Sequence, residues 1–117
     1  MNAVELEKFA KQYNSFEKAH EGFWVYVNSW LSDEPEEFVE AFNSNDISTS
    51  TKLSNERIAL VINYRWDDPI YFVQTTLNVE INEREIAQYH LLQTLDGEDM
   101  DDGLSFSNVC FVPRNID

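Results

Sequence analysis

The spacing of the large side chains changes near the middle of the chain, and this change limits which folds the chain can form. Between Phe9 and Trp30 they recur every three or four positions, the spacing of one face of a helix. From Arg57 to Ile81 they recur at every second position, the spacing of one face of a strand. The sequence therefore predicts helices first and strands after them.

The helical part predicts two or three helices. Gly22 interrupts the first apolar stripe and lowers helix stability by about 1 kcal/mol relative to Ala. We therefore expect one helix over 3–20 and a second over 22–31. Ser32–Asp33–Glu34–Pro35 is typical of a third helix start, because Pro fits the first turn and acidic residues follow near the positive end of the helix dipole. Asn43–Ser44–Asn45–Asp46 ends this helix.

The second half predicts an antiparallel sheet. Residues 47–54 form either a polar edge strand or a loop. The expected strands cover residues 57–66, 70–81, 86–95 and 104–112, with turns at 67–69 and 82–85 and an acidic loop over 96–103. Connections this short join antiparallel neighbours. The predicted fold is a single α+β domain over residues 1–117, with helices within about 3–43 packed on a four- to five-stranded sheet.

Acidic residues dominate the charge of the chain. Twenty-two Asp and Glu face eight Lys and Arg, which gives a net charge of −14. No Lys or Arg lies between Lys18 and Lys52, or between Arg84 and Arg114. Such a charge repels nucleic acid and acidic lipids and attracts basic proteins, so we expect no direct nucleic-acid or membrane partner. It also exceeds the magnitude of roughly 2–8 that solubility of a small domain requires.

Chemistry-bearing motifs are lacking, so the sequence predicts neither an enzyme nor a cofactor or metal. In the acidic segment, Met100 occupies a position where a calcium loop needs an oxygen ligand. Cys110 lies among apolar residues, as a buried inert thiol does, and a single Cys forms no internal disulfide. We expect His20 to be a packing residue on the apolar helical stripe and His90 to be a surface or partly buried strand residue. Residues 1–10 lack the apolar core of a secretory signal, which predicts a cytoplasmic location.

Partner-binding residues are predicted from the acidic runs and from two aromatic residues. Tyr26 points away from the apolar helical stripe and Trp66 adjoins two aspartates, so both are expected to be partly exposed contact residues. The acidic residues are expected to steer and pair with Lys and Arg of a basic protein. The complete predicted set is Tyr26, Asp33, Glu34, Glu36, Glu37, Glu40, Trp66, Asp67, Asp68, Asp96, Glu98, Asp99, Asp101 and Asp102.

The segment Tyr89–His90–Leu91 through Leu95–Asp96–Gly97 to Asp101–Asp102–Gly103–Leu104 places an acidic loop between two expected strands. With its size, acidity and helix-then-strand order, the chain resembles the small acidic immunity proteins of bacterial toxin–immunity systems. The resemblance implies a module that binds a basic toxin domain, such as a nuclease, and covers its substrate-binding cleft. Two alternatives are a small assembly protein that forms a homodimer and an inhibitor that imitates the charge of DNA.

Overall fold

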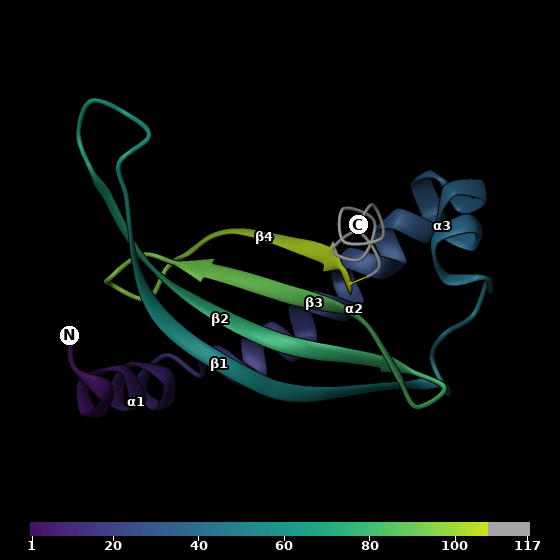
Figure 1. Cartoon of the computed structure of the whole chain (residues 1–117), viewed down its shortest axis with the longest axis horizontal. Coiled ribbons are helices and arrows are strands. Elements are labelled where there is room, and N and C mark those ends of the chain that lie inside the picture. The colour runs from purple at the N-terminus through teal and green to yellow at the C-terminus, as the bar shows by residue number, and fades with distance from the viewer. Residues whose placement is uncertain (108–117) are drawn as a thin grey trace, which may run out of the picture.

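The computed structural model describes residues 1–107 and has an α+β fold (Figure 1). Its elements are α1 (Ala3–Gln12), α2 (Ser15–Asp33), α3 (Pro35–Phe42), β1 (Thr51–Asn63), β2 (Ile70–Ile81), β3 (Arg84–Gln93) and β4 (Asp99–Phe106). The strands form one antiparallel sheet in the order β1-β2-β3-β4, and α2 crosses behind it in Figure 1. The predicted fold class is confirmed.

The core lies between α2 and the centre of the sheet. Alternate residues of β2, from Val73 to Val79, are fully buried, as the period of two predicted. They face the apolar stripe of α2, on which Phe23 and Val27 are equally buried. The ring of Trp30 lies 5.7 Å from that of Phe38 in α3, which holds this short helix against α2.

The predicted helix break at Gly22 is wrong, because α2 runs through this residue and the break lies at Tyr13 and Asn14. Asn14 has a φ of 52°, in the left-handed region that Asn adopts more readily than most residues. After this turn, the buried Ser15 hydroxyl donates a hydrogen bond of 2.7 Å to the Gln93 side chain. Tertiary packing on β3 therefore sets the start of α2.

The strands β1 and β3 differ from the prediction at both ends, while β2 has the predicted ends. β1 spans 51–63 and not 57–66, so only the second half of the ambiguous segment 47–54 is strand. β3 spans 84–93 and not 86–95, because Asn82 and Glu83 alone make the turn before it. Both residues have positive φ, at 52° and 66°, as the twist of a two-residue hairpin turn requires.

The expected acidic loop over 96–103 is also wrong, because Asp99 to Gly103 belong to β4. The turn is short since the Thr94 carbonyl accepts a 2.9 Å hydrogen bond from the Gly97 amide, and Gly97 has a φ of 85°. β4 therefore begins before the expected residue 104. Residues 108–112 of the expected strand, with Cys110, lie outside the described residues.

The hairpin of β1 and β2 extends beyond the rest of the sheet. Pairing of β2 with β3 ends at Val73 and Gln93, whereas pairing with β1 continues to Asn63 and Ile70. The hairpin end thus lies at the opposite side of the molecule from α3 (Figure 1). Within residues 1–107, no helix is both long and apolar enough to span a membrane.

Candidate functional site

A groove of about 480 Å³ lies between the second half of α2, the start of α3 and β4. The helical residues Tyr26, Trp30 and Asp33 share one face of α2 because they follow each other at intervals of four and three positions. We call this feature the acidic groove, and its lining residues are Val25, Tyr26, Ser29, Trp30, Asp33, Glu34, Glu37 and Asp102. It brings Asp102 together with carboxylates about seventy positions earlier in the chain.

Neutral donors hold two of the groove carboxylates. The indole N–H of Trp30 donates to Oε1 of Glu37 at 3.0 Å, which links α2 to α3. The Tyr89 hydroxyl donates to Oδ2 of Asp102 at 2.6 Å, which links β3 to β4. Neither donor carries a charge, so both carboxylates are oriented while their negative charge remains.

Tyr89 is a fixed donor because its hydroxyl does not ionise in the neutral range. Burial, followed by the hydrogen bond to Asp102, raises the pKa of Tyr89 far above its usual range. The ring is fully buried and lies 5.9 Å from that of Phe23 in an edge-to-face arrangement. A Cβ at Gly22 would collide with the Tyr89 hydroxyl, so the glycine that we expected to break the helix makes room for this side chain.

Cations do not neutralise the groove within the described part of the chain. No Lys or Arg is among the lining residues. The ion pairs found within residues 1–107 are Lys18 with Asp99 at 3.9 Å and Arg57 with Glu56 at 3.8 Å. Both involve carboxylates outside the groove, so the groove carries uncompensated negative potential.

Five of the predicted partner-binding residues line the acidic groove, namely Tyr26, Asp33, Glu34, Glu37 and Asp102. Tyr26 is partly buried, as predicted, and its ring lies 6.2 Å from that of Tyr89. Glu36 lines a shallow hollow that Glu34 and Glu37 share, and Glu40 is exposed on the next turn of α3. The predicted acidic start of α3 thus forms one side of the groove.

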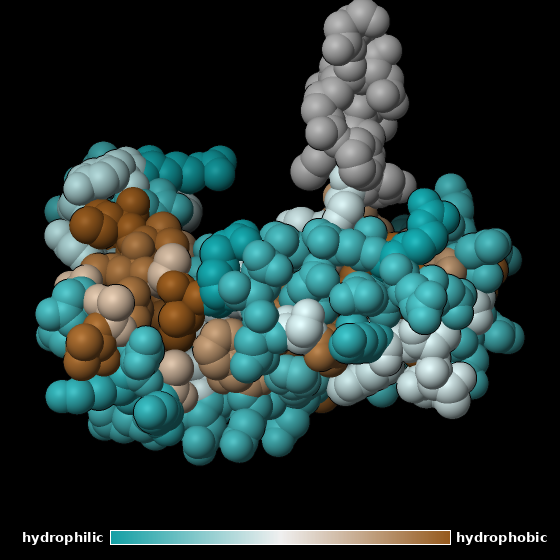
Figure 2. Space-filling view, turned by 60° about the horizontal axis from the view of Figure 1, so that its bottom comes forward, coloured by the Kyte–Doolittle hydropathy of each residue, from teal (hydrophilic) through white to brown (hydrophobic). Residues whose placement is uncertain are grey.

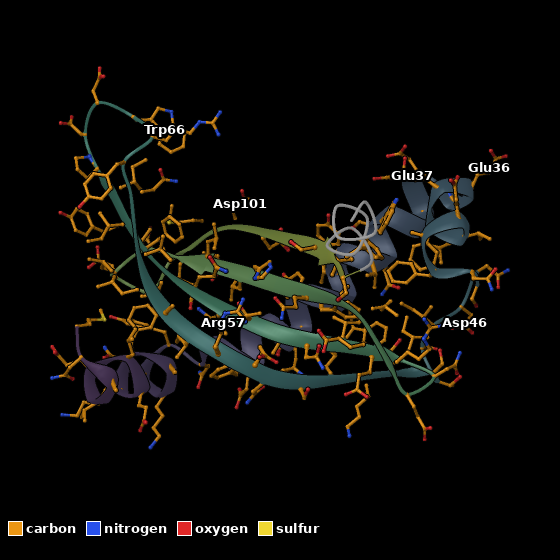
Figure 3. All side chains as sticks on the ribbon, viewed as in Figure 1. Glu36, Glu37, Asp46, Arg57, Trp66 and Asp101 are labelled. Carbon is orange, nitrogen blue, oxygen red and sulfur yellow. The ribbon has the colours of Figure 1, made fainter. Side chains whose placement is uncertain are left out.

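Other predicted residues lie elsewhere. Asp96 and Glu98 are in the turn between β3 and β4, and Asp99 pairs with Lys18. Asp101 is paired opposite Leu92 on the sheet face that α2 does not cover (Figure 3). Trp66, Asp67 and Asp68 are exposed in the hairpin end, and Figure 3 shows Trp66 far from Glu36 and Glu37. The structure therefore divides the predicted set between the acidic groove with its α3 side and three other places.

The sequence did not indicate the two hydrogen-bond donors of the site, Trp30 and Tyr89, or the lining residues Val25 and Ser29. Trp30 fits the apolar stripe of α2, which assigns it to the core, yet its indole N–H reaches the groove. Its spacing of four from Tyr26 is the signal that places both on one helix face. Tyr89 lies inside a strand, and only the tertiary structure shows that it contacts Asp102.

The uncovered face of the sheet carries a second polar cluster around His90. Its Nδ1 lies 3.1 Å from Nε2 of Gln74 and 3.0 Å from Oγ1 of Thr76. Burial, followed by the charge of Arg57, lowers the pKa of His90, so the neutral ring is favoured. The other histidine, His20, has its Nε2 at 3.1 Å from Oδ1 of Asn55. Within residues 1–107, no group of three or more His, Cys, Asp or Glu is arranged to hold a metal.

Comparison with known proteins gives no further guide to the site. The chain matches no family model, no curated protein and no solved structure. The chemistry of the acidic groove therefore stands on its own geometry.

Proposed function

We propose that this protein is a binding module that holds a basic protein in the acidic groove. The observation that carries the proposal is the convergence of Asp33, Glu37 and Asp102 from three different elements around two aromatic rings, with no Lys or Arg of residues 1–107 in the lining. A solubilising coat of charge requires no such convergence. A cationic side chain of a partner is the group that this environment fits.

The groove offers two kinds of contact to a Lys or Arg side chain. The carboxylates accept charge-assisted hydrogen bonds, which are roughly twice as strong as neutral ones. Tyr26 and Trp30 are the aromatic lining residues, and a cation placed over an aromatic ring face gains about 0.5–2 kcal/mol according to its desolvation. The net charge of −14 adds long-range attraction that accelerates association and weakens with salt.

We further propose that the partner is a basic toxin domain and that the protein neutralises it as an immunity protein. Support comes from the resemblance in size, acidity and element order, and from the uncompensated charge of the acidic groove. A nuclease fits this role, because its substrate cleft must be basic to bind a phosphate backbone. A carboxylate surface seated over that cleft competes with the phosphates of the substrate.

Co-purification with the product of the neighbouring gene, followed by calorimetric titration, tests this proposal. We expect binding that weakens steeply between about 50 mM and about 500 mM NaCl. Reversal of two groove charges, Asp33→Lys with Glu37→Lys, is expected to weaken binding by at least about tenfold more than a control of the same net charge. The control is Glu7→Lys with Glu17→Lys, on exposed helix surface outside the groove. Equal losses in both variants would contradict a role for the groove.

A second candidate function is self-assembly, which the exposed apolar hairpin end favours. Figure 2 shows apolar side chains gathered at the end of the molecule where the hairpin and α1 lie. The exposed large side chains of the hairpin are Ile62, Tyr64, Trp66, Ile70 and Tyr71. Apolar patches of this kind mark interaction surfaces when they are contiguous.

Light scattering after size-exclusion chromatography tests this second function. A homodimer held by the hairpin end has twice the monomer mass, and Trp66→Ser with Tyr71→Ser is expected to return it to a monomer. Because both side chains are at least half exposed, at 57% and 50%, this variant is expected to keep its fold. A monomer at every concentration of the unmodified protein would exclude the homodimer.

A further inference from the structure

The two edges of the sheet differ in how they are protected. β1 is one edge, and it is disrupted by a bulge between Asn55 and Arg57 and flanked by α1, which packs against it (Figure 1). β4 is the other edge, and within residues 1–107 it pairs with β3 alone. An edge strand leaves one row of backbone N–H and C=O groups without ladder partners, which is a template for another strand.

The acidic groove lies directly beside this free edge. Asp102 belongs both to β4 and to the groove, while the opposite wall is formed by α2. Tyr26 and Trp30 line the groove, and their rings lie near those of Tyr89 in β3 and Phe106 in β4, so the groove is on the side of α2 that faces this edge of the sheet. The groove therefore lies where one further strand beside β4 would cover α2.

Successive side chains of β4 point to opposite faces of the sheet, and this alternation determines which side chains an added strand would contact. Asp102, Leu104 and Phe106 are paired with residues of the buried β3 face, so they point towards the helices. Gly103 points to the uncovered face, and apart from its own atoms and those of its chain neighbours, no heavy atom of residues 1–107 lies within 4 Å of the place where its Cβ would be. On the uncovered face an added strand thus has room beside Gly103 and meets Asp101, and on the helical face it meets Asp102 and the other groove carboxylates.

We propose that the basic partner binds through an extended segment that pairs with the free edge of β4 and places Lys or Arg, at every second position, in the acidic groove. This inference rests on the proposed function and specifies its binding mode. Main-chain hydrogen bonds supply affinity, and the alternating side chains supply specificity. A second copy of this chain does not supply the cations that the groove carboxylates call for, because its own β4 (DMDDGLSF) contains no Lys or Arg.

A synthetic peptide tests the inference without knowledge of the partner. The probe has eight residues, the length of β4, with alternating Lys and Thr. The control peptide has the same sequence and charge, with N-methyl groups on alternate amides that block strand pairing along one edge. Binding to the full-length protein is followed by NMR titration and amide exchange at about 50 mM NaCl.

We expect the unmethylated peptide to bind about tenfold more tightly and to slow amide exchange in β4, because blocked strand hydrogen bonds lower its affinity. The combined variant Glu37→Gln and Asp102→Asn keeps shape and hydrogen-bond capacity, and it is expected to weaken both peptides. Equal, salt-sensitive binding of the two peptides would overturn strand pairing while leaving the acidic groove as the site. If neither peptide binds, the proposed function is overturned as well. Slow exchange of the outward β4 amides before peptide is added would show that the edge is already covered, and would also overturn the inference.

Discussion

Replacement of Gly22 by Ala gives opposite results for the two roles that this residue could have in α2. If Gly22 only weakens the helix, Ala stabilises the protein by about 1 kcal/mol through its higher helix propensity. The structure predicts the reverse. The new Cβ would collide with the hydroxyl of Tyr89, which is hydrogen-bonded to Asp102 at 2.6 Å and whose ring is fully buried in a close-packed core.

The magnitude follows from three contributions. Overpacking a well-packed core costs about 1–3 kcal/mol. Displacement of Tyr89 also weakens its hydrogen bond to the Asp102 carboxylate, and bonds to charged groups contribute about 1.5–3 kcal/mol. We count only part of this hydrogen-bond energy as lost, because Asp102 is exposed and water can bind its carboxylate when Tyr89 moves away. After the gain in helix propensity is subtracted, Gly22→Ala is expected to destabilise the fold by about 2 kcal/mol.

Urea unfolding followed by Trp fluorescence measures this change, and a double-mutant cycle identifies its cause. In a Tyr89→Phe background the colliding oxygen is absent and the next ring atom lies 3.3 Å from the new Cβ, so Gly22→Ala is expected to become neutral or stabilising there. Gly103→Ala is the matched control, because nothing lies within 4 Å of its Cβ position. The reasoning is refuted if Gly22→Ala stabilises the unmodified protein, or if its effect is the same in both backgrounds.

Two further predictions concern the turn before β3 and the polar face of the sheet. Glu83 has a φ of 66°, which disfavours a residue with a Cβ, so Glu83→Gly is expected to stabilise the fold by about 0.5–1 kcal/mol in urea unfolding; a loss of stability would contradict the turn geometry. The pKa of His90 is lowered in the folded state, first by burial and then by Arg57, so the unfolded chain takes up the proton first as pH falls. The stabilising contribution of neutral His90 is therefore present above the ordinary His pKa of about 6.5 and is lost as pH falls through and below it. His90→Gln is expected to flatten the decline of stability between about pH 7 and about pH 5, and an unchanged pH dependence would contradict this assignment.

The elements that the sequence predicted well are those in which local signals agree with the tertiary structure. β2 has a period of two, a preceding Pro69 and a following turn, and its ends fall where predicted. α3 begins at Pro35, because Pro in the first turn and acidic residues after it need no distant contact. The prediction of a helix break at Gly22 was wrong, because this position needs a glycine to make room for the Tyr89 side chain. Tyr89 is about seventy positions away in the sequence, so no local signal shows this contact.

The site was predictable only in its local part. Asp33, Glu34 and Glu37 lie close in the sequence and close in space, so the acidic run itself indicates that wall of the groove. Asp102 joins them only because β4 pairs with β3 in a register that places it opposite Leu91 on the helical face. The segment around Asp102 is rich in Asp and Gly, which are uncommon in strands, so its composition predicts a loop. Pairing with β3 nevertheless makes it a strand.

Within residues 1–107, two carboxylates of the acidic groove, those of Glu37 and Asp102, are held by hydrogen bonds from neutral donors and not by ion pairs. An ion pair such as Lys18 with Asp99 orients a carboxylate but cancels its charge. The donors to Glu37 and Asp102 are neutral side chains. Elsewhere in the chain, the Ser48 side-chain and backbone donors lower the pKa of Asp46, also without adding a cation. Such bonds restrict side-chain freedom before any partner arrives, so less conformational entropy is lost on binding. Neutral donors thus fix the position of the negative charge and leave its full strength for a cationic partner.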